Sequence, residues 1–131
     1  MTLNPEKAAL RKHLLEKRDS TSFDLMEIHS EKILSKLMKT KVISEAKSIA
    51  CYYSIGSEVQ TVKLITQLLD EKKSVSLPRI SSNTMSFRTI DDLSKLDKGE
   101  FDIPEPKDNA PIQEKHDVIL VPCVGLDGEG N

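Results

Sequence analysis

The feature that most constrains this chain is its last fifteen residues, where an unbroken apolar run passes directly into a glycine-rich, acidic turn. Val118 to Val121 has the length and the β-branched content of a strand that is covered on both faces, as strands of a parallel sheet are. Ligands on open α/β sheets lie outside the carboxyl ends of the strands. We therefore expect a small-molecule site in residues 122–131, where three glycines allow the backbone to approach a phosphate closely.

Length and charge limit the class of protein. A chain of 131 residues predicts one α/β domain, residues 1–131, because domains usually hold about 100–200 residues. The 19 basic and 21 acidic residues are interspersed and give a net charge of −2, which argues against a nucleic-acid partner or a polybasic membrane surface. No apolar run approaches the roughly 20 residues that span a bilayer, and the N-terminus predicts a charged helix rather than a signal peptide. We expect a cytoplasmic protein that binds small molecules, a monomer when complete.

The cysteines and histidines do not form a recognisable reactive or metal-binding pattern. Cys51 and Cys123 lie in apolar, strand-like runs without Cys-x-x-Cys spacing, so we expect two reduced, buried thiols. His13, His29 and His116 are too far apart, and too poorly supported by nearby cysteines or carboxylates, to predict a metal site. No Ser-His-Asp, Walker or dinucleotide fingerprint is present, so no covalent nucleophile is indicated.

Helical periodicity predicts three helices. The first begins near Pro5 and runs to Arg18, with Leu3, Leu10 and Leu14 at helical spacing beside a basic stripe. A second helix is predicted from Asp24, as N-cap with Glu27 three residues later, to about Lys39. A third begins at Thr61, and its apolar face ends at a charged cluster, residues 70–73.

The strand pattern predicts the fold class. Strands are expected at residues 48–53 and 74–77, with Pro78-Arg79 closing the second, and a shorter edge strand at residues 85–90. The proline-rich segment 101–106 is expected to be a loop or an ordered extended segment. The order of elements predicts a βαβ crossover within an α/β fold, with further helices covering a face of an open, mostly parallel sheet.

Four groups of residues are candidates for binding, and each has an ordinary structural alternative. Lys7 and Arg11 are four apart on a helix and can clamp phosphates, but a solvated basic face is the commoner case. Asp127 among glycines suits a metal ion or an ordinary Asp-Gly turn. Tyr53 and Glu58, at the end of the first strand, can stack on a flat ligand and accept its N–H donors, but a glutamate in a loop is usually just solvated. An apolar wall beside cations is offered by Met85, Phe87, Arg79 and Arg88, although Met and Phe in alternation are more often core residues.

Taken together, these segments are recognisable. Five motifs follow one another along the chain: Lys7-x-x-Leu10-Arg11, Tyr53-Ser54-x-x-x-Glu58-Val59-x-Thr61, Leu77-Pro78-Arg79 with Met85-x-Phe87, Phe101-x-Ile103-x-Glu105-Pro106, and Asp117-x-Ile-Leu-Val-Pro122 with Leu126-Asp127-x-x-Gly130. In the order and spacing of these motifs the chain resembles the 5-formyltetrahydrofolate cyclo-ligase family, also called methenyltetrahydrofolate synthetases, across essentially its whole length.

The resemblance implies a fold and an activity. The fold would be a three-layer α/β/α arrangement similar to the sugar-isomerase and CoA-transferase scaffold. The reaction would be ATP-dependent cyclisation of 5-formyltetrahydrofolate to 5,10-methenyltetrahydrofolate, with Mg²⁺ and release of ADP and phosphate. By the same resemblance, Lys7 and Arg11 would contact ATP phosphates, while Tyr53, Glu58, Met85 and Phe87 would line the folate site. No metal ligand is assigned to a residue.

The chain departs from the family pattern after Asn131. In the family, the Asp-x-x-Gly turn is followed by an arginine and a Gly-Tyr-Tyr-Asp segment that holds phosphates, folate and magnesium, so we expect the domain to be incomplete at its C-terminus and the 131-residue form to be inactive by itself. A fragment of a longer protein is favoured because Lys7, Arg11, Tyr53 and Glu58 stand where the pattern requires them. Two other functions stay open: a truncated, non-catalytic folate- or nucleotide-binding remnant, and a sugar-phosphate isomerase or acyltransferase on the same scaffold.

Overall fold

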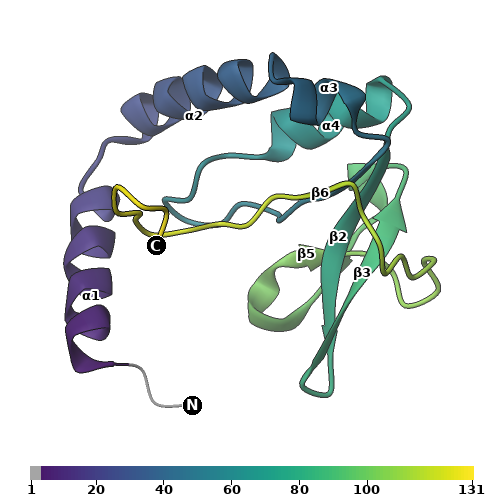
Figure 1. The fold of residues 1–131 in the computed structure, drawn as a ribbon. Coiled ribbons are helices and arrows are strands. Elements are labelled where there is room, and N and C mark those ends of the chain that lie inside the picture. Colours follow the sequence, from purple (N-terminus) through teal and green to yellow (C-terminus); the bar gives the residue numbers. More distant parts are fainter. Residues whose placement is uncertain (1–3) are drawn as a thin grey trace.

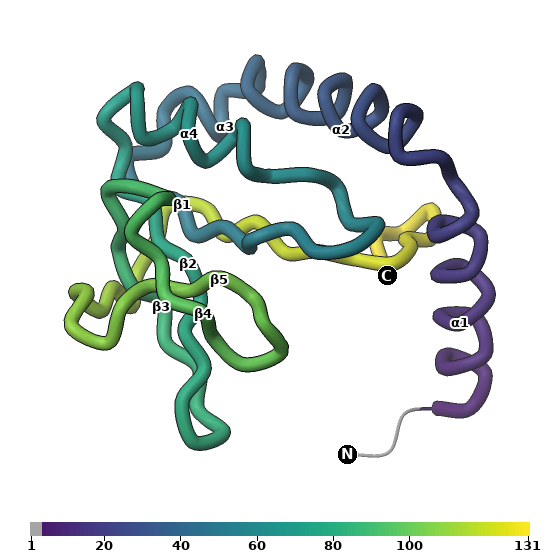
Figure 2. The backbone as a smooth tube through the Cα atoms, turned by 180° about the vertical axis from the view of Figure 1, so that it is seen from behind, coloured from purple at the N-terminus to yellow at the C-terminus, as the bar shows by residue number. Residues whose placement is uncertain are grey.

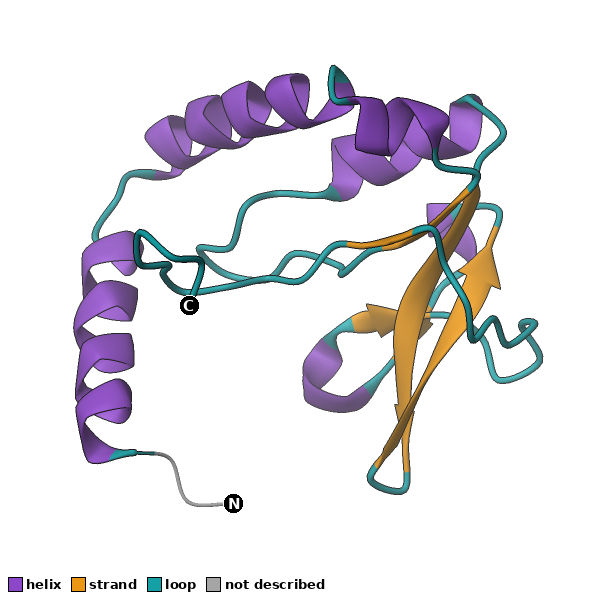
Figure 3. Ribbon diagram, in the orientation of Figure 1, coloured by secondary structure: helices purple, strands orange, loops and turns teal. Residues whose placement is uncertain are grey.

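The structure is a computed structural model and describes residues 4–131 (Figure 1). Three helices precede the first strand, and a fourth helix lies between the first two strands; Figure 3 shows helices and strands by colour. The helices are α1 Pro5–Asp19, α2 Phe23–Met38, α3 Lys41–Glu45 and α4 Val62–Asp70, with short 3-10 helices η1 Leu93–Lys95 and η2 Glu100–Asp102. The strands are β1 Ser48–Ala50, β2 Ser74–Ser81, β3 Thr84–Ile90, β4 Asp97–Lys98, β5 Pro104–Glu105 and β6 Val118–Ile119.

The central sheet has four strands in the order β3-β2-β1-β6. Strand β1 pairs in parallel with β2 on one side, with Ile49 opposite Val75, and with β6 on the other, with Ile49 opposite Val118. The edge strand β3 returns antiparallel to β2, and strands β4 and β5 form a separate two-stranded sheet. The prediction of an α/β fold with an open, mostly parallel sheet flanked by helices is therefore confirmed; the single-domain prediction stays a prediction.

The hydrophobic core lies where α4 packs on the parallel strands. Leu64, Ile65 and Leu68 recur at helical spacing, so they share one face of α4 and are almost completely buried. They meet residues from β1 and β2, such as Ile49 and Val75, which are fully buried. Helix α2 contributes only partly buried side chains to this core, namely Leu34, Leu37 and Met38.

The caps of the first two helices explain where they begin. Helix α1 starts at Pro5 because Asn4 precedes it as N-cap, with its Oδ1 accepting hydrogen bonds from the backbone N–H groups of Glu6 at 2.9 Å and Lys7 at 3.4 Å. The prediction of Asp24 as N-cap of α2 was wrong. Ser22 takes that place, and its Oγ accepts the N–H of Leu25 at 3.2 Å, which leaves Asp24 inside the first turn.

Two strand boundaries differ from the prediction. Strand β1 ends at Ala50 rather than Tyr53, although the N–H of Cys51 still donates to the carbonyl of Ser76. Strand β2 continues through Pro78 to Ser81, so the prediction that Pro78-Arg79 closes it was wrong. The pairing of β2 with β1 ends at Ser76. Beyond that point β2 belongs only to the hairpin with β3, where a proline is tolerated.

The apolar run after Asp117 is covered on one face only. Val118 and Leu120 pack against the core, whereas Ile119 is 52% and Val121 73% exposed, so the expectation of a strand buried on both faces was wrong. Side chains alternate along an extended chain, and the described residues cover only the inward-facing ones. Cys123, expected to be buried, is exposed because it lies past the strand in the following loop; both cysteines are free, and Cys51 is buried as expected.

Helix α1 stands apart from the sheet and meets the chain again at the C-terminal loop (Figure 1). None of its described residues is buried, and Leu10, expected on its apolar face, is 56% exposed. Leu3 lies outside the described residues. Among residues 4–131, no helix combines the length and the apolar character that crossing a bilayer requires.

Candidate functional site

The candidate site lies where the segments that follow two parallel strands reach α1. The segments after β1 and β6 run side by side away from the sheet in both Figure 1 and Figure 2. The two segments begin as neighbours because β1 and β6 are paired, and the N–H of Leu120 donates to the carbonyl of Ala50 at 2.8 Å. The carboxyl ends of neighbouring parallel strands therefore deliver two loops, residues 51–61 and 120–131, to the same place, as the sequence predicted for a ligand site.

A cavity of about 540 Å³ lies between α1 and the C-terminal loop. Helix α1 contributes one wall, with both predicted phosphate contacts, and the glycine-containing loop contributes the other. The lining residues are Lys7, Ala8, Leu10, Arg11 and Leu14 from the helix, and Pro122, Cys123, Val124, Gly125, Leu126, Asp127 and Asn131 from the loop. The sparse apolar stripe of α1 thus faces this cavity rather than the sheet core.

Lys7 and Arg11 are exposed side chains on the helical wall of the cavity. Among the ion pairs within residues 4–131, neither of them takes part in one. Two cations without an internal carboxylate partner, beside exposed backbone, form an arrangement that suits an anionic ligand.

The loop opposite α1 is shaped by two glycines. A Cβ atom on Gly125 would lie 2.6 Å from Cδ1 of Leu14, so the absence of a side chain permits the close approach of loop and helix. Gly130 has a φ of +88°, a backbone conformation that glycine adopts without strain.

Asp127 is engaged within this loop. Its Oδ1 accepts the backbone N–H groups of Glu129 and Asn131, each at 2.9 Å, and its Oδ2 accepts the side-chain amide of Asn131 at 3.1 Å. Hydrogen bonds from Asn131 and then Glu129 lower the pKa of the Asp127 carboxyl below its usual value. Of the two interpretations of Asp127, the structure shows the Asp-Gly turn. In residues 4–131, no group of three or more His, Cys, Asp or Glu side chains is placed to hold a metal ion.

The predicted folate residues Tyr53 and Glu58 lie in the loop that follows β1. Oε1 of Glu58 accepts the N–H of Ile55 at 2.9 Å, so this carboxylate closes its own turn while its side chain stays partly exposed. Tyr53 is partly buried and packs against the hydrophobic core. Neither residue lines the cavity beside α1.

Sequence reasoning missed Tyr52, the neighbour of Tyr53. Its hydroxyl donates to the carbonyl of Val59 at 3.0 Å, and this bond joins the beginning of loop 51–61 to a residue near its end. Burial, followed by the negative charge of Glu58, raises the pKa of Tyr52 to about 12. The alternation of Ile49, Cys51 and Tyr53 toward the core was the available signal, because it placed Tyr52 on the opposite face.

Sequence reasoning also missed Arg18 and Ser57, which join α1 to the two loops. Nε of Arg18 donates to Oγ of Ser57 at 2.8 Å, and Ser57 in turn donates to the carboxylate of Asp19. A guanidinium nitrogen of Arg18 also donates to the carbonyl of Cys123 at 3.4 Å. The sequence predicted Arg18 on the same basic stripe of the first helix as Lys7 and Arg11, but no local pattern indicated its distant partners.

The predicted wall of Met85 and Phe87 lies on the β2–β3 hairpin and does not line the cavity beside α1. Met85 is 60% exposed, while Phe87 is partly buried with its ring edge-to-face against His116, at a centroid distance of 5.3 Å. The cations expected beside this wall have internal partners. Arg79 pairs with Glu105 at 3.3 Å, and Arg88 donates to the carbonyls of Asp108 and Ala110.

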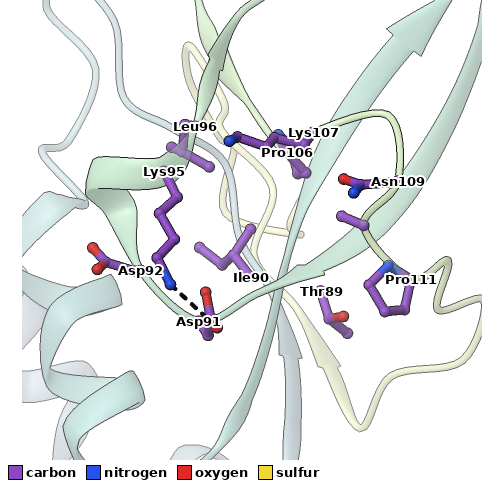
Figure 4. Close-up of a pocket in the computed structure, with 11 residues that line it drawn as sticks. Thr89, Ile90, Asp91, Asp92, Lys95, Leu96, Pro106, Lys107, Asn109 and Pro111 are labelled. Atoms are coloured by element: carbon purple, nitrogen blue, oxygen red, sulfur yellow. Dashed lines mark ion pairs between the residues drawn. The ribbon is translucent and has the colours of Figure 1, made fainter.

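A second cavity, of about 400 Å³, lies at the end of β3 (Figure 4). Its wall carries an ion pair of Lys95 with Asp91 at 3.9 Å, and it contains none of the predicted site residues. The cavity beside α1 is therefore the better candidate, since it joins the glycine-containing loop to Lys7 and Arg11, which form no ion pair in the described part of the chain.

The sequence matches the 5-formyltetrahydrofolate cyclo-ligase family over residues 3–131. The chain belongs to this family. A 5-formyltetrahydrofolate cyclo-ligase of Haemophilus influenzae (strain Rd) is 34% identical over an alignment that covers 66% of this chain and 50% of that protein.

Two solved synthetase structures resemble the chain. The 5,10-methenyltetrahydrofolate synthetase of Aquifex aeolicus superposes with a TM-score of 0.83 at 31% identity, covering 92% of this chain and 62% of that one. The 5,10-methenyltetrahydrofolate synthetase of Mycoplasma pneumoniae gives a TM-score of 0.67 at 26% identity, covering 92% of this chain and 65% of that one. The chain thus spans half the length of the curated cyclo-ligase it matches and less than two thirds of each of these structures.

Proposed function

We propose that the protein catalyses ATP-dependent cyclisation of 5-formyltetrahydrofolate to 5,10-methenyltetrahydrofolate. Family membership supports the choice of substrate, and one feature of the structure supports the use of ATP. That feature is the cavity between α1 and residues 122–131, which combines Lys7 and Arg11 with the close-packed glycine loop.

The chemistry asks for charge stabilisation rather than for a protein nucleophile. The formyl oxygen attacks the γ-phosphorus of ATP, forming an O–P bond as the bond to ADP breaks. N10 of the folate then bonds to the activated carbon and gives up its proton, and the carbon–oxygen bond breaks as inorganic phosphate leaves. Fixed positive charge stabilises the phosphoryl group in transfer, and in-line positioning of the reactants replaces a random encounter. Lys7 and Arg11 would supply that charge from the helical wall.

The folate would lie toward the loop that follows β1. Glu58 carries a partly exposed carboxylate that can accept the N–H donors of a pterin edge through the oxygen not bound to Ile55. Tyr53, in the loop that follows β1, would contact the flat rings from the core side. Met85 and Phe87 lie on strand β3, so they would contact the folate from the hairpin side.

Magnesium is expected to enter with the nucleotide. Mg²⁺ in such sites is usually held by substrate phosphates, a few waters and one or two carboxylates. Asp127 is the carboxylate in the cavity lining, and its oxygens already accept hydrogen bonds from Glu129 and Asn131. The described residues therefore do not form a metal site of their own.

The proposal is tested by turnover of the full-length protein. Near-ultraviolet absorbance follows the methenyl product after mixing with 5-formyltetrahydrofolate, ATP and Mg²⁺. We expect product only when ATP is present, with one ADP formed per methenyl group, and no product with a non-hydrolysable ATP analogue. Product that forms equally well without ATP, or ADP that forms without folate turnover, would contradict the proposed reaction.

A further inference from the structure

We propose that Arg18 is a positioning residue that couples the nucleotide side of the site to the folate side. The inference rests on the proposed function, because it assigns the two loops that Arg18 contacts to two different ligands. It adds a residue that lies outside the five motifs of the family resemblance.

Arg18 is the point where three separate segments meet. It lies in the last turn of α1, its Nε donates to Ser57 at 2.8 Å, and its guanidinium also donates to the carbonyl of Cys123 at 3.4 Å. These partners are 39 and 105 residues away in the sequence. One planar guanidinium can donate to both partners at once, because its N–H groups point in different, fixed directions.

The contact with Ser57 continues into the folate side. The Ser57 hydroxyl accepts from Arg18 and donates to the carboxylate of Asp19, so two consecutive residues of α1 hold this serine. Glu58 follows directly and closes the turn onto Ile55, and the N–H of Gln60 is held by Oγ of Ser30 at 3.0 Å. A shift of α1 therefore moves the anchor next to Glu58 while the other end of the loop stays fixed to α2.

The contact with Cys123 continues into the nucleotide side. Cys123 lies in the part of the loop that lines the cavity opposite Lys7 and Arg11. Arg11 and Arg18 are seven residues apart on one helix, about 10 Å along its axis at the usual rise, so the helix transmits a displacement between them as a rigid body. A nucleotide bound between the cations and the C-terminal loop would therefore order the contacts of Arg18 with Ser57 and Cys123. A folate bound at Glu58 would depend on the same contacts.

Each ligand should consequently lower the cost of ordering the contacts for the other. Such coupling is reciprocal, so the factor by which folate strengthens nucleotide binding must equal the factor in the opposite direction. We expect a factor of about five or more in the protein, within the usual range for coupled sites.

The experiment measures this factor by titration calorimetry. A non-hydrolysable ATP analogue is titrated into the full-length protein with and without 5-formyltetrahydrofolate, and the reverse titration checks reciprocity. Arg18→Ala should reduce the coupling factor to about one. Arg18→Lys should restore it only in part, because an ammonium lacks the planar fork. Lys17→Ala is the matched control: it removes the same charge from the same turn. Lys17 is exposed and its side chain takes part in no ion pair within residues 4–131, so this variant should keep the full factor.

Ser57→Ala provides an independent variant if Arg18→Ala fails to fold, since it removes the acceptor of Nε and leaves the arginine in place. It should also lower the coupling factor. Retained coupling in the folded Arg18 or Ser57 variants, or two ligands that bind the unaltered protein independently, would overturn the role of Arg18 and leave the proposed reaction standing. Failure of the unaltered protein to bind either ligand would instead overturn the proposed function.

Discussion

The sequence offers candidate cations in two regions, the β2–β3 hairpin and helix α1, and the surroundings of these cations differ in the structure. Arg79, on the hairpin side, is only 17% exposed in its side chain, lies 3.3 Å from the 10% exposed carboxylate of Glu105, and donates to the carbonyl of Pro106 at 2.7 Å. Lys7 and Arg11, on the α1 side, are exposed beside a cavity and have no ion pair within residues 4–131.

The difference indicates which polar residues serve the fold and which remain for a ligand. A buried cation must have its partners within the protein, since removing it from water without compensation is costly. An exposed cation has no such requirement and can exchange water for a phosphate. The hairpin arginine should therefore affect stability, whereas the α1 cations should affect binding.

The largest expected effect comes from Arg79→Met. The change leaves the carboxylate of Glu105 largely buried with no cation beside it, and breaking such a pair costs about 3 kcal/mol, the lower end of the usual range because the pair is not fully buried. Denaturant unfolding measures the loss. Nucleotide affinity of the folded fraction should stay unchanged.

The double variant Arg79→Met/Glu105→Leu is the control for this prediction. It removes the uncompensated charge together with its partner, so it should recover part of the lost stability. If Arg79→Met binds nucleotide more weakly while unfolding at the same denaturant concentration, the division between the two groups of cations is wrong.

Lys7→Ala and Arg11→Ala should show the opposite pattern. Each removes a charge-assisted contact to phosphate worth about 1.5–3 kcal/mol, so nucleotide affinity should fall by at least about tenfold per residue in calorimetry. The free energy of unfolding should change by less than about 0.5 kcal/mol, as for other exposed positions. Folate affinity measured without nucleotide should be retained; an unchanged ATP titration would return both residues to a solvated basic face.

The sequence predicted the elements whose signal is local and repeated. Helix α4 and strands β1 and β2 were found because Leu64, Ile65 and Leu68 recur at helical spacing and the strands are apolar and short. Helix α3 was missed, because five residues are too few to show a period. The N-cap of α2 was misplaced because both Ser22 and Asp24 are good capping residues, and only the backbone geometry distinguishes them.

The site was predicted less completely, because its contacts are distant in sequence. The spacing of four made Lys7 and Arg11 candidates beside the commoner solvated face, and only the family resemblance assigned them to ATP. The structure places both in the lining of the cavity beside the glycine-containing loop. Arg18 was not found, since its partners lie far along the chain and arginine at a helix C-terminus is common. The exposure of Cys123 and Val121 was mispredicted because an apolar run does not reveal which of its two faces is covered.

Glu58→Gln tests a residue that belongs to neither group, because its carboxylate closes a turn and is also partly exposed. Glutamine keeps an oxygen that can accept the N–H of Ile55, so the free energy of unfolding should stay within about 0.5 kcal/mol. The lost charge should lower folate affinity by about tenfold, since charge-assisted hydrogen bonds are roughly twice as strong as neutral ones. Reduced stability with unaltered folate affinity would make Glu58 a purely structural residue.

The smallest expected effects concern Asp117 and Asp127, whose pKa values are both lowered by hydrogen bonds that their carboxylates accept. The pKa of Asp117 is lowered by hydrogen bonds from the backbone N–H groups of Lys47 and then Ser48, and that of Asp127 by hydrogen bonds from Asn131 and Glu129. Asp117 ties the start of β1 to the start of β6, at 2.8 Å from the N–H of Lys47, whereas Asp127 closes only the C-terminal loop.

Thermal unfolding as a function of pH should separate these two roles. A folded-state pKa below the usual value of about 4 means that the ionised Asp117 stabilises the fold above that pH, and that this contribution is lost as pH falls through the lowered pKa. Asp117→Asn should therefore lower the Tm slightly at pH 7, and the difference from the unaltered protein should disappear in acid. Asp127→Asn should leave the Tm at pH 7 unchanged, because its bonds hold a loop rather than the sheet, but should weaken nucleotide binding through a loosened cavity wall. Equal Tm changes in both variants would show that the C-terminal loop unfolds together with the sheet. The distinction between residues that stabilise the fold and residues that serve the ligand site would then be wrong.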